Sequence, residues 1–179
     1  MNLGSPCETQ TMQRRSLLKL GATAAIVLSI AGGAAAWLQP GLERGTLSPL
    51  GREVFRSVGM AVLDKTLPAQ EGAREIALEG LLQRVDVLVA ALPQPTQNEL
   101  SQLLSVLGHP AGRLSLAGLA RPWADAPLED VQKALQAMRV SSLALRQQAY
   151  AALHEITAGA YFSDPSSWSL LGYPGPLKI

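Results

Sequence analysis

The chain has 179 residues, of which 47% are hydrophobic, 16% charged and 4% aromatic. This balance excludes a disordered chain and favours helices packed on helices, so we expect an all-α fold. From Trp37 onward, twelve basic side chains face thirteen acidic ones, and this near-neutral part shows no nucleic-acid footprint, which would need Lys and Arg gathered on one face.

A targeting signal is predicted at the start of the chain. Residues 13–19, Gln-Arg-Arg-Ser-Leu-Leu-Lys, resemble the twin-arginine motif, although Gln13 departs from the usual Ser or Thr. The paired arginines are intact and stand directly before an apolar stretch at about 20–37. The resemblance implies that the twin-arginine translocase exports the protein already folded. We assign the export signal to Arg14, Arg15, Leu17, Leu18 and Lys19.

The apolar stretch ends in a sequence typical of signal peptidase sites. Ala34 and Ala36 form an A-x-A-like pattern, which predicts cleavage after Ala36 and a signal peptide over residues 1–36. The alternative is a retained membrane anchor, because about 20 residues at helical rise can span a bilayer. Either outcome places the following domain in the periplasm, free or associated with the inner membrane.

The single cysteine, Cys7, precedes the twin arginines. A cleaved protein would therefore contain no disulfide, thiolate nucleophile or cysteine-ligated metal.

The remaining chain predicts a small helical bundle. Residues 37–48 are rich in Pro and Gly and are interpreted as a linker, followed by a helical domain over 49–159. Helical spacing of apolar residues predicts one helix from Pro49, capped by Ser48, to Leu67 and a second over 73–92.

The later helices are predicted from caps and apolar spacing. Thr96 and Glu99 match a capping box that opens a short third helix. Residues 111–126 fit either a short helix or an extended strip and are left unassigned. From Pro127 the spacing predicts one long helix or two that break near Ser141 and Ser142.

Few residues of the sequence are candidates for catalysis or for metal binding. His109 and His154 lie too far apart to form a metal motif, and His109 is expected in a solvent-facing turn. The acidic pairs Glu71/Glu75, Glu75/Glu79 and Glu129/Asp130 are interpreted as solvated helix faces. We therefore predict no catalytic residue, no metal site and no cofactor bound by this chain.

The C-terminal tail, residues 160–179, differs from what precedes it. It is aromatic, rich in Pro and Gly, and lacks helical periodicity. Such a segment can strap its own bundle, dock on another protein, or do both. The residues predicted to dock are Tyr161, Phe162, Asp164, Pro165, Trp168, Gly172, Tyr173 and Pro174.

This tail resembles the end of the gluconate 2-dehydrogenase subunit 3 family, through Ala-Tyr-Phe-Ser-Asp-Pro at 160–165, Trp168 and Leu-Gly-Tyr-Pro-Gly-Pro at 171–176. The resemblance implies a small helical subunit that escorts a large FAD-dependent flavoprotein of the glucose–methanol–choline oxidoreductase type, often with a cytochrome c subunit. The FAD would belong to the partner. The alternative from the residues alone is a free-standing periplasmic protein that binds a small apolar ligand between helices.

Overall fold

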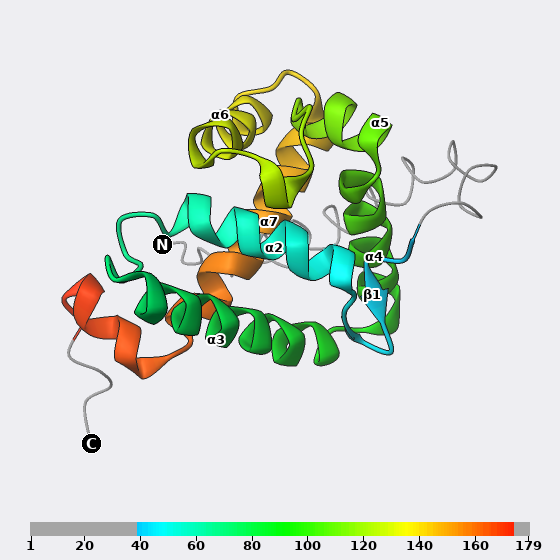
Figure 1. The fold of residues 1–179 in the computed structure, drawn as a ribbon. Helices are drawn as coiled ribbons and strands as arrows, with labels where there is room; N and C mark the ends of the chain where they lie inside the picture. Colours follow the sequence, from blue (N-terminus) through cyan, green and yellow to red (C-terminus); the bar gives the residue numbers. More distant parts are fainter. Residues whose placement is uncertain (1–38, 174–179) are drawn as a thin grey trace, which may run out of the picture. The chain divides into compact units, whose positions relative to one another are not determined.

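The computed structural model describes residues 39–173, and within this range the side chains of residues 169–171 are not described. The predicted leader, its cleavage residues Ala34 and Ala36, and Pro174 lie outside the described residues. Within the described range the chain is mostly helical, as predicted (Figure 1). The helices are α2 (Pro49–Val62), α3 (Glu71–Ala90), α4 (Gln94–Gly108), α5 (Pro110–Gly112), α6 (Leu128–Arg139) and α7 (Ala144–Phe162).

Helix α2 is the centre of the bundle and packs against α3, α4, α6 and α7. Its start is the one that the sequence predicts, because the Ser48 hydroxyl accepts a hydrogen bond from the Gly51 amide at 3.1 Å and Pro49 occupies the first turn. Its end comes a turn earlier than predicted. The carbonyl of Leu63 accepts hydrogen bonds from the amide and the hydroxyl of Thr66, at 2.8 and 2.9 Å. A tight turn therefore replaces the last residues of the predicted helix.

The predicted linker is partly a folded hairpin, and this corrects the expectation for residues 37–48. Strand β1 (Leu42–Glu43) pairs antiparallel with β2 (Thr46–Leu47). Between them Arg44 and Gly45 both have positive φ, 53° and 82°, as a two-residue hairpin turn requires. The Leu47 side chain is buried, and its amide donates to Asp86 Oδ1 at 2.7 Å. The hairpin therefore belongs to the domain, and its strands were too short to show periodicity.

The capping box predicted at Thr96 and Glu99 is wrong. Helix α4 begins at Gln94, so Thr96 lies inside its first turn and Pro93 precedes it. Pro95 also lies in the first turn of α4, where a proline has no helical amide hydrogen bond to lose and its fixed φ suits the helix. Pro93 and Pro95 therefore mark the start of α4 as well as the region after the end of α3.

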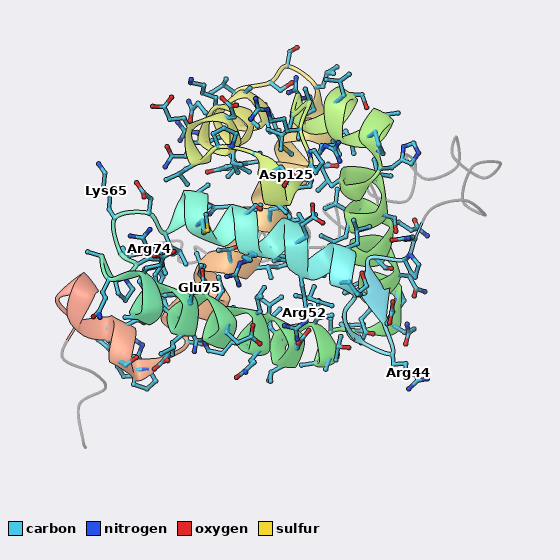
Figure 2. The ribbon with its side chains drawn as sticks, in the orientation of Figure 1. Arg44, Arg52, Lys65, Arg74, Glu75 and Asp125 are labelled. Carbon is cyan, nitrogen blue, oxygen red and sulfur yellow. The ribbon has the colours of Figure 1, made fainter. Side chains whose placement is uncertain are left out.

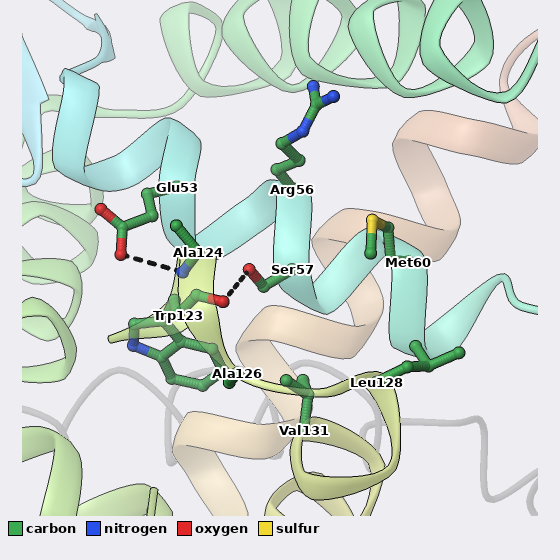
Figure 3. A pocket seen from close by; sticks show the side chains of 9 residues that line it. All are labelled: Glu53, Arg56, Ser57, Met60, Trp123, Ala124, Ala126, Leu128 and Val131. Atoms are coloured by element: carbon green, nitrogen blue, oxygen red, sulfur yellow. Dashed lines mark hydrogen bonds between the residues drawn. The ribbon is translucent and has the colours of Figure 1, made fainter. Parts of the chain in front are cut away.

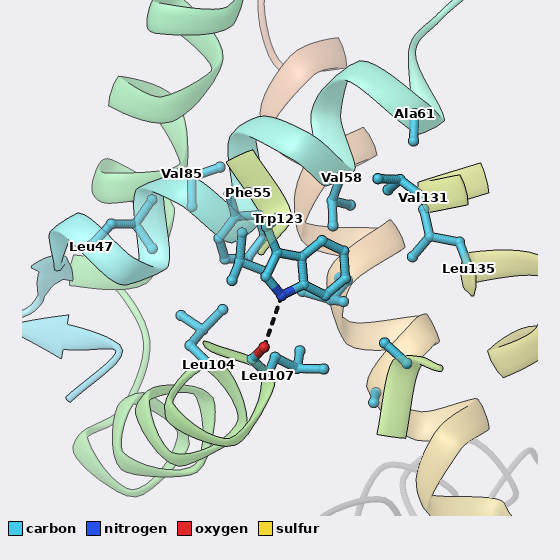
Figure 4. Packing of buried hydrophobic residues seen from close by; sticks show 14 of the residues in the cluster. Leu47, Phe55, Val58, Ala61, Val85, Leu104, Leu107, Trp123, Val131 and Leu135 are labelled. Atoms are coloured by element: carbon cyan, nitrogen blue, oxygen red, sulfur yellow. Dashed lines mark hydrogen bonds between the residues drawn. The ribbon is translucent and has the colours of Figure 1, made fainter. Parts of the chain in front are cut away.

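The first part of the unassigned residues 111–126 forms a short helix, which is one of the two structures considered, and the rest is mostly irregular. After α5 comes a π-helical turn, η3 (Arg113–Ala117), and then a 3₁₀ turn, η4 (Trp123–Asp125). The Trp123 ring is buried, and its Nε1 donates to the Leu107 carbonyl at 2.8 Å (Figure 4). This segment therefore inserts the largest core side chain between α2 and α4.

The last helical region breaks where the sequence suggests, at residues 140–143, between α6 and α7. Helix α7 then continues to Phe162, beyond Gly159, so the predicted boundary of the tail at residue 160 is wrong. A 3₁₀ helix, η5 (Pro165–Leu171), follows, so the tail is also less irregular than predicted. No helix in the range 39–173 is both long enough and apolar enough to cross a membrane.

Candidate partner-docking site

Residues 163–173, which we name the C-terminal strap, are fastened to the bundle at their first turn. Arg84 of α3 donates from Nε to the Ala160 carbonyl at 2.8 Å and from a terminal nitrogen to Asp164 Oδ2 at 3.0 Å. The other carboxylate oxygen of Asp164 accepts from the Ser166 amide at 2.9 Å. Figure 1 shows the strap in red where it follows α7 alongside α3.

The hydrogen bonds to Asp164 lower its pKa. The largest cause is the backbone amide of Ser166, followed by the Ser166 hydroxyl and then the positive charge of Arg84, while partial burial opposes them. Asp164 is therefore ionised at neutral pH, as the ion pair and the capping of η5 both require. Asp164 thus lies in the turn between the end of α7 at Phe162 and the start of η5 at Pro165.

Two aromatic side chains of the strap lie together. The rings of Trp168 and Tyr173 have centroids 5.4 Å apart, and Trp168 Nε1 donates to the Phe162 carbonyl at 2.9 Å. The chain turns back between them at Gly172, whose φ of 66° favours glycine. Tyr173 is 48% exposed and Trp168 is half-buried, so the pair presents aromatic surface at the end of the described chain.

Tyr161 and Phe162 are placed differently from the rest of the predicted docking set. Tyr161 is only 6% exposed, its hydroxyl donates to the Thr66 carbonyl at 3.3 Å, and its ring meets that of Phe162 edge to face at 5.2 Å. Tyr161 therefore anchors α7 in its own core, and we do not include it in the docking surface. Phe162 is half-buried at the edge of that core.

Arg84 is the residue that sequence reasoning missed. It lies between buried Leu82 and buried Val85, within the apolar stripe of α3. A basic residue among these apolar residues was the available signal that another part of the chain supplies hydrogen-bond acceptors for Arg84.

Acidic residues singled out as pairs have structural partners. Glu75 and Glu79 of α3 form ion pairs with Arg56 and Arg52 of α2, and Figure 2 labels Arg52 and Glu75 in this region. Arg52 also pairs with Asp86, the residue that holds the hairpin. These carboxylates connect α2, α3 and β2, so Glu75 and Glu79 form ion pairs between helices and are not only solvated, as the sequence interpretation had it.

The two histidines belong to different elements of the fold. His109 is exposed at the junction of α4 and α5, as expected, and its Nδ1 accepts from the Ala111 amide at 3.3 Å. His154 is half-buried on α7 and its ring lies 5.4 Å from that of Tyr150. In the described part of the chain no three His, Cys, Asp or Glu residues gather as a metal site would require.

A small open pocket lies between α2 and the η4–α6 segment (Figure 3). Its volume is about 130 Å³, whereas pockets for drug-sized ligands usually hold roughly 300–1,000 Å³. Two of its polar groups are already bound, since Ser57 donates to the Trp123 carbonyl at 2.7 Å and Glu53 accepts from the Ala124 amide at 3.1 Å. The pocket is better suited to anchoring η4 than to holding a ligand of that size.

Comparisons of the chain with protein-family models, with curated proteins and with solved structures found no match. The family resemblance of the tail therefore stays a prediction that rests on the residues quoted for it. The geometry of the strap is an independent observation.

Proposed function

We propose that this chain is a non-catalytic accessory subunit that binds an FAD-dependent dehydrogenase in the cytoplasm, carries it through twin-arginine export, and stays bound to it in the periplasm. The observation that carries the proposal is the strap, which is fixed at its start and presents aromatic surface at its end. The partner is a large flavoprotein of the glucose–methanol–choline oxidoreductase type, and a cytochrome c subunit is the further expected component.

The fastening of the strap supports a docking role. A segment already held in one conformation loses little conformational entropy when a partner binds it. The ion pair of Arg84 with Asp164, the cap from Asp164 to Ser166 and the Trp168–Phe162 hydrogen bond each reduce that freedom.

The composition of the strap also supports this role. Tyrosine and tryptophan are enriched at protein interfaces because they combine a large apolar area with a polar tip. In the proposed complex Trp168 and Tyr173 contact the flavoprotein directly, together with Phe162, Pro165 and Pro174, while Asp164 and Gly172 set the path of the backbone. The FAD and the chemistry belong to the partner.

The first test is to express the full chain with an affinity tag in its native host, isolate it from the periplasm, and record the visible spectrum and protein composition of the eluate. Flavin absorption with a large co-purifying oxidoreductase is the expected result. A colourless chain that elutes alone would refute the escort function and favour the small-ligand-binding alternative.

A second test locates the docking surface. Tyr173→Ala removes an exposed ring, and loss of an interface hot spot typically weakens binding by about 2 kcal/mol or more, which is roughly thirtyfold. Val87→Ala, at an exposed apolar residue of α3, is the matched control and should leave capture unchanged. Equal capture by both variants would exclude Tyr173 from the interface.

A truncation completes the test, and the structure dictates where it must begin. Removal from residue 160 onward would delete buried Tyr161 and destabilise the bundle, so loss of the partner would be ambiguous. A chain that ends after Ser163 keeps all of α7 and removes only the remainder of the strap and tail. Survival of the complex after this truncation would refute the proposed docking site.

A further inference from the structure

Charge is divided unevenly along the described chain. Residues 100–124 and 131–154 contain five basic side chains and no acidic one, whereas the other described residues contain six basic and thirteen acidic side chains. The two acid-free segments meet in the fold, because η3 packs against α4 and α6, and Arg146 of α7 donates to the Leu116 carbonyl at 2.8 Å. Asp125, Glu129 and Asp130 lie between the two segments in sequence, so residues 100–154 as a whole contain five basic and three acidic side chains. The end that includes η3 and the α6–α7 connection therefore has a modest basic excess, in a domain that is nearly neutral as a whole.

Most of the positive charge at this end is not neutralised by carboxylates. Lys133 pairs with Glu129, but none of the four arginines, Arg113, Arg121, Arg139 and Arg146, forms an ion pair with a carboxylate within residues 39–173. Arg113 is buried and is held by the carbonyls of Gly108, Leu119 and Ala120. Arg121 and Arg139 are exposed. The end therefore has a positive potential that can attract an anionic surface.

Exposed aliphatic side chains lie at the same end. Val140 and Leu143, in the connection between α6 and α7, are 66% and 61% exposed, and Leu114 on η3 is 57% exposed. Figure 1 shows this connection and the segment after α5 along one edge of the domain, at the top of the view. Aliphatic tips flanked by arginines form the pattern by which proteins insert shallowly into a charged lipid interface, where the apolar groups enter the acyl boundary and the cations meet the headgroups.

We propose that this end, defined by Leu114, Arg121, Arg139, Val140, Leu143 and Leu145, docks the domain on an anionic lipid surface. The exposed aliphatic side chains favour a lipid surface over a purely ionic partner. A polyanion would leave their apolar surface exposed to water, whereas the acyl region of a bilayer would bury it. The proposal is independent of the dehydrogenase complex, because the strap and this end are separate sets of residues. An escort subunit with both surfaces would hold its partner close to the membrane.

The test uses the full chain and flotation with vesicles of phosphatidylcholine, alone or mixed with phosphatidylglycerol. We expect stronger binding to the mixed vesicles and a loss of that difference at high salt, because salt screens the headgroup charge. Arg139→Gln should weaken partitioning about fivefold, the effect usual for one basic residue near an anionic surface. Val140→Ser combined with Leu143→Ser should weaken it by about tenfold or more.

Matched controls come from α3 and the segment before it, which lie outside the residues that define the proposed surface. Ile76 and Val87 on α3 are 76% and 72% exposed, so Ile76→Ser with Val87→Ser removes similar apolar area elsewhere. Lys65→Gln removes an exposed positive charge away from the proposed surface. Neither control should change partitioning by more than about twofold, and an equal effect of the control and test variants would overturn the proposal.

A second measurement is needed because the predicted leader could bind vesicles of either composition and so mask the contribution of the proposed surface in the flotation assay. In a Cys7→Ser background, Ser142→Cys places a fluorescent label in the α6–α7 connection and Gln83→Cys places one on α3, both at exposed positions. Quenchers attached to lipid chains should quench the label at 142 in anionic vesicles and not the label at 83. Equal quenching at both positions, or no quenching at position 142, would overturn the proposal. Binding of an acidic protein to this end, without any contact with lipid, would also overturn it.

Discussion

Arg84 of α3 and Asp164 of the strap form an ion pair across 80 positions of sequence, at 3.0 Å. The same arginine also binds the Ala160 carbonyl near the end of α7 at 2.8 Å. One side chain therefore joins the longest helix of the described domain to the end of α7 and to the start of the strap. The ionisation of Asp164 should consequently control how firmly the strap is held.

We predict that the strap loosens at acidic pH while the bundle stays folded. Because the pKa of Asp164 is lowered in the folded protein, its carboxylate contributes stability that is fully present above its unfolded pKa of about 3.9 and is lost as the pH falls through the lower folded value. Hydrogen exchange at the Ser167 and Tyr173 amides, which donate to Asp164 and Trp168 within the strap, should accelerate over that range relative to amides of α2.

Two variants separate the causes of this pH dependence. Asp164→Asn should abolish it, because no titrating group remains at that position. Arg84→Met should keep most of it, since the backbone hydrogen bond from Ser166 is a larger cause of the lowered pKa than the charge of Arg84. An Arg84→Met protein with no pH dependence would show that this order of causes is wrong.

We predict that Gly51→Ala destabilises the protein, although alanine normally favours a helix over glycine by about 1 kcal/mol. A methyl group at position 51 would collide with the Gly41 carbonyl of the hairpin entrance and approach Leu47 Cδ2 at 3.3 Å. The collision involves backbone, so the cost should be about 1–3 kcal/mol in urea unfolding. Gly72→Ala, also in the first turn of a helix but with open space around it, is the control and should be neutral or mildly stabilising.

A third prediction tests the extension of α7 beyond its expected end. Gly159 lies inside the helix and is exposed, and a methyl group on its Cα would meet no other side chain or distant backbone atom within 4 Å. Gly159→Ala should therefore stabilise the protein by roughly 0.5–1 kcal/mol through reduced freedom of the unfolded chain. A decrease in the urea midpoint would indicate that the helix ends before Gly159.

The sequence predicted those parts of the fold that depend on local signals. Ser48 and Pro49 started α2 correctly because capping is decided within a few residues. Residues 42–47 were missed because each strand has two residues and its hairpin depends on Ser101 and Asp86, which lie far along the chain. The helical domain was predicted to end at residue 159, but α7 continues to Phe162, where Tyr161 and the Ala160 carbonyl bind distant residues.

The candidate site shows the same division. Asp164, Trp168 and Tyr173 stood out by composition alone, but burial of Tyr161 and the role of Arg84 depend on how α3, α7 and the strap pack. The basic end was hidden for a similar reason. A count over the whole domain is nearly neutral, and the separation of charge appears only when residues 100–124 and 131–154 are seen to meet.

The last prediction concerns Thr157, which is fully buried on α7. Its hydroxyl is the buried side-chain polar atom that has no hydrogen-bond partner within the described residues. Burial of an unpaired hydroxyl costs about 1–3 kcal/mol relative to a paired one, and valine fills nearly the same space without that cost. Thr157→Val should raise the free energy of unfolding by about 1 kcal/mol, measured by urea denaturation, whereas Thr157→Ser should lower it because it keeps the hydroxyl and leaves a methyl-sized cavity. If valine instead destabilises the protein, the hydroxyl must be paired in solution.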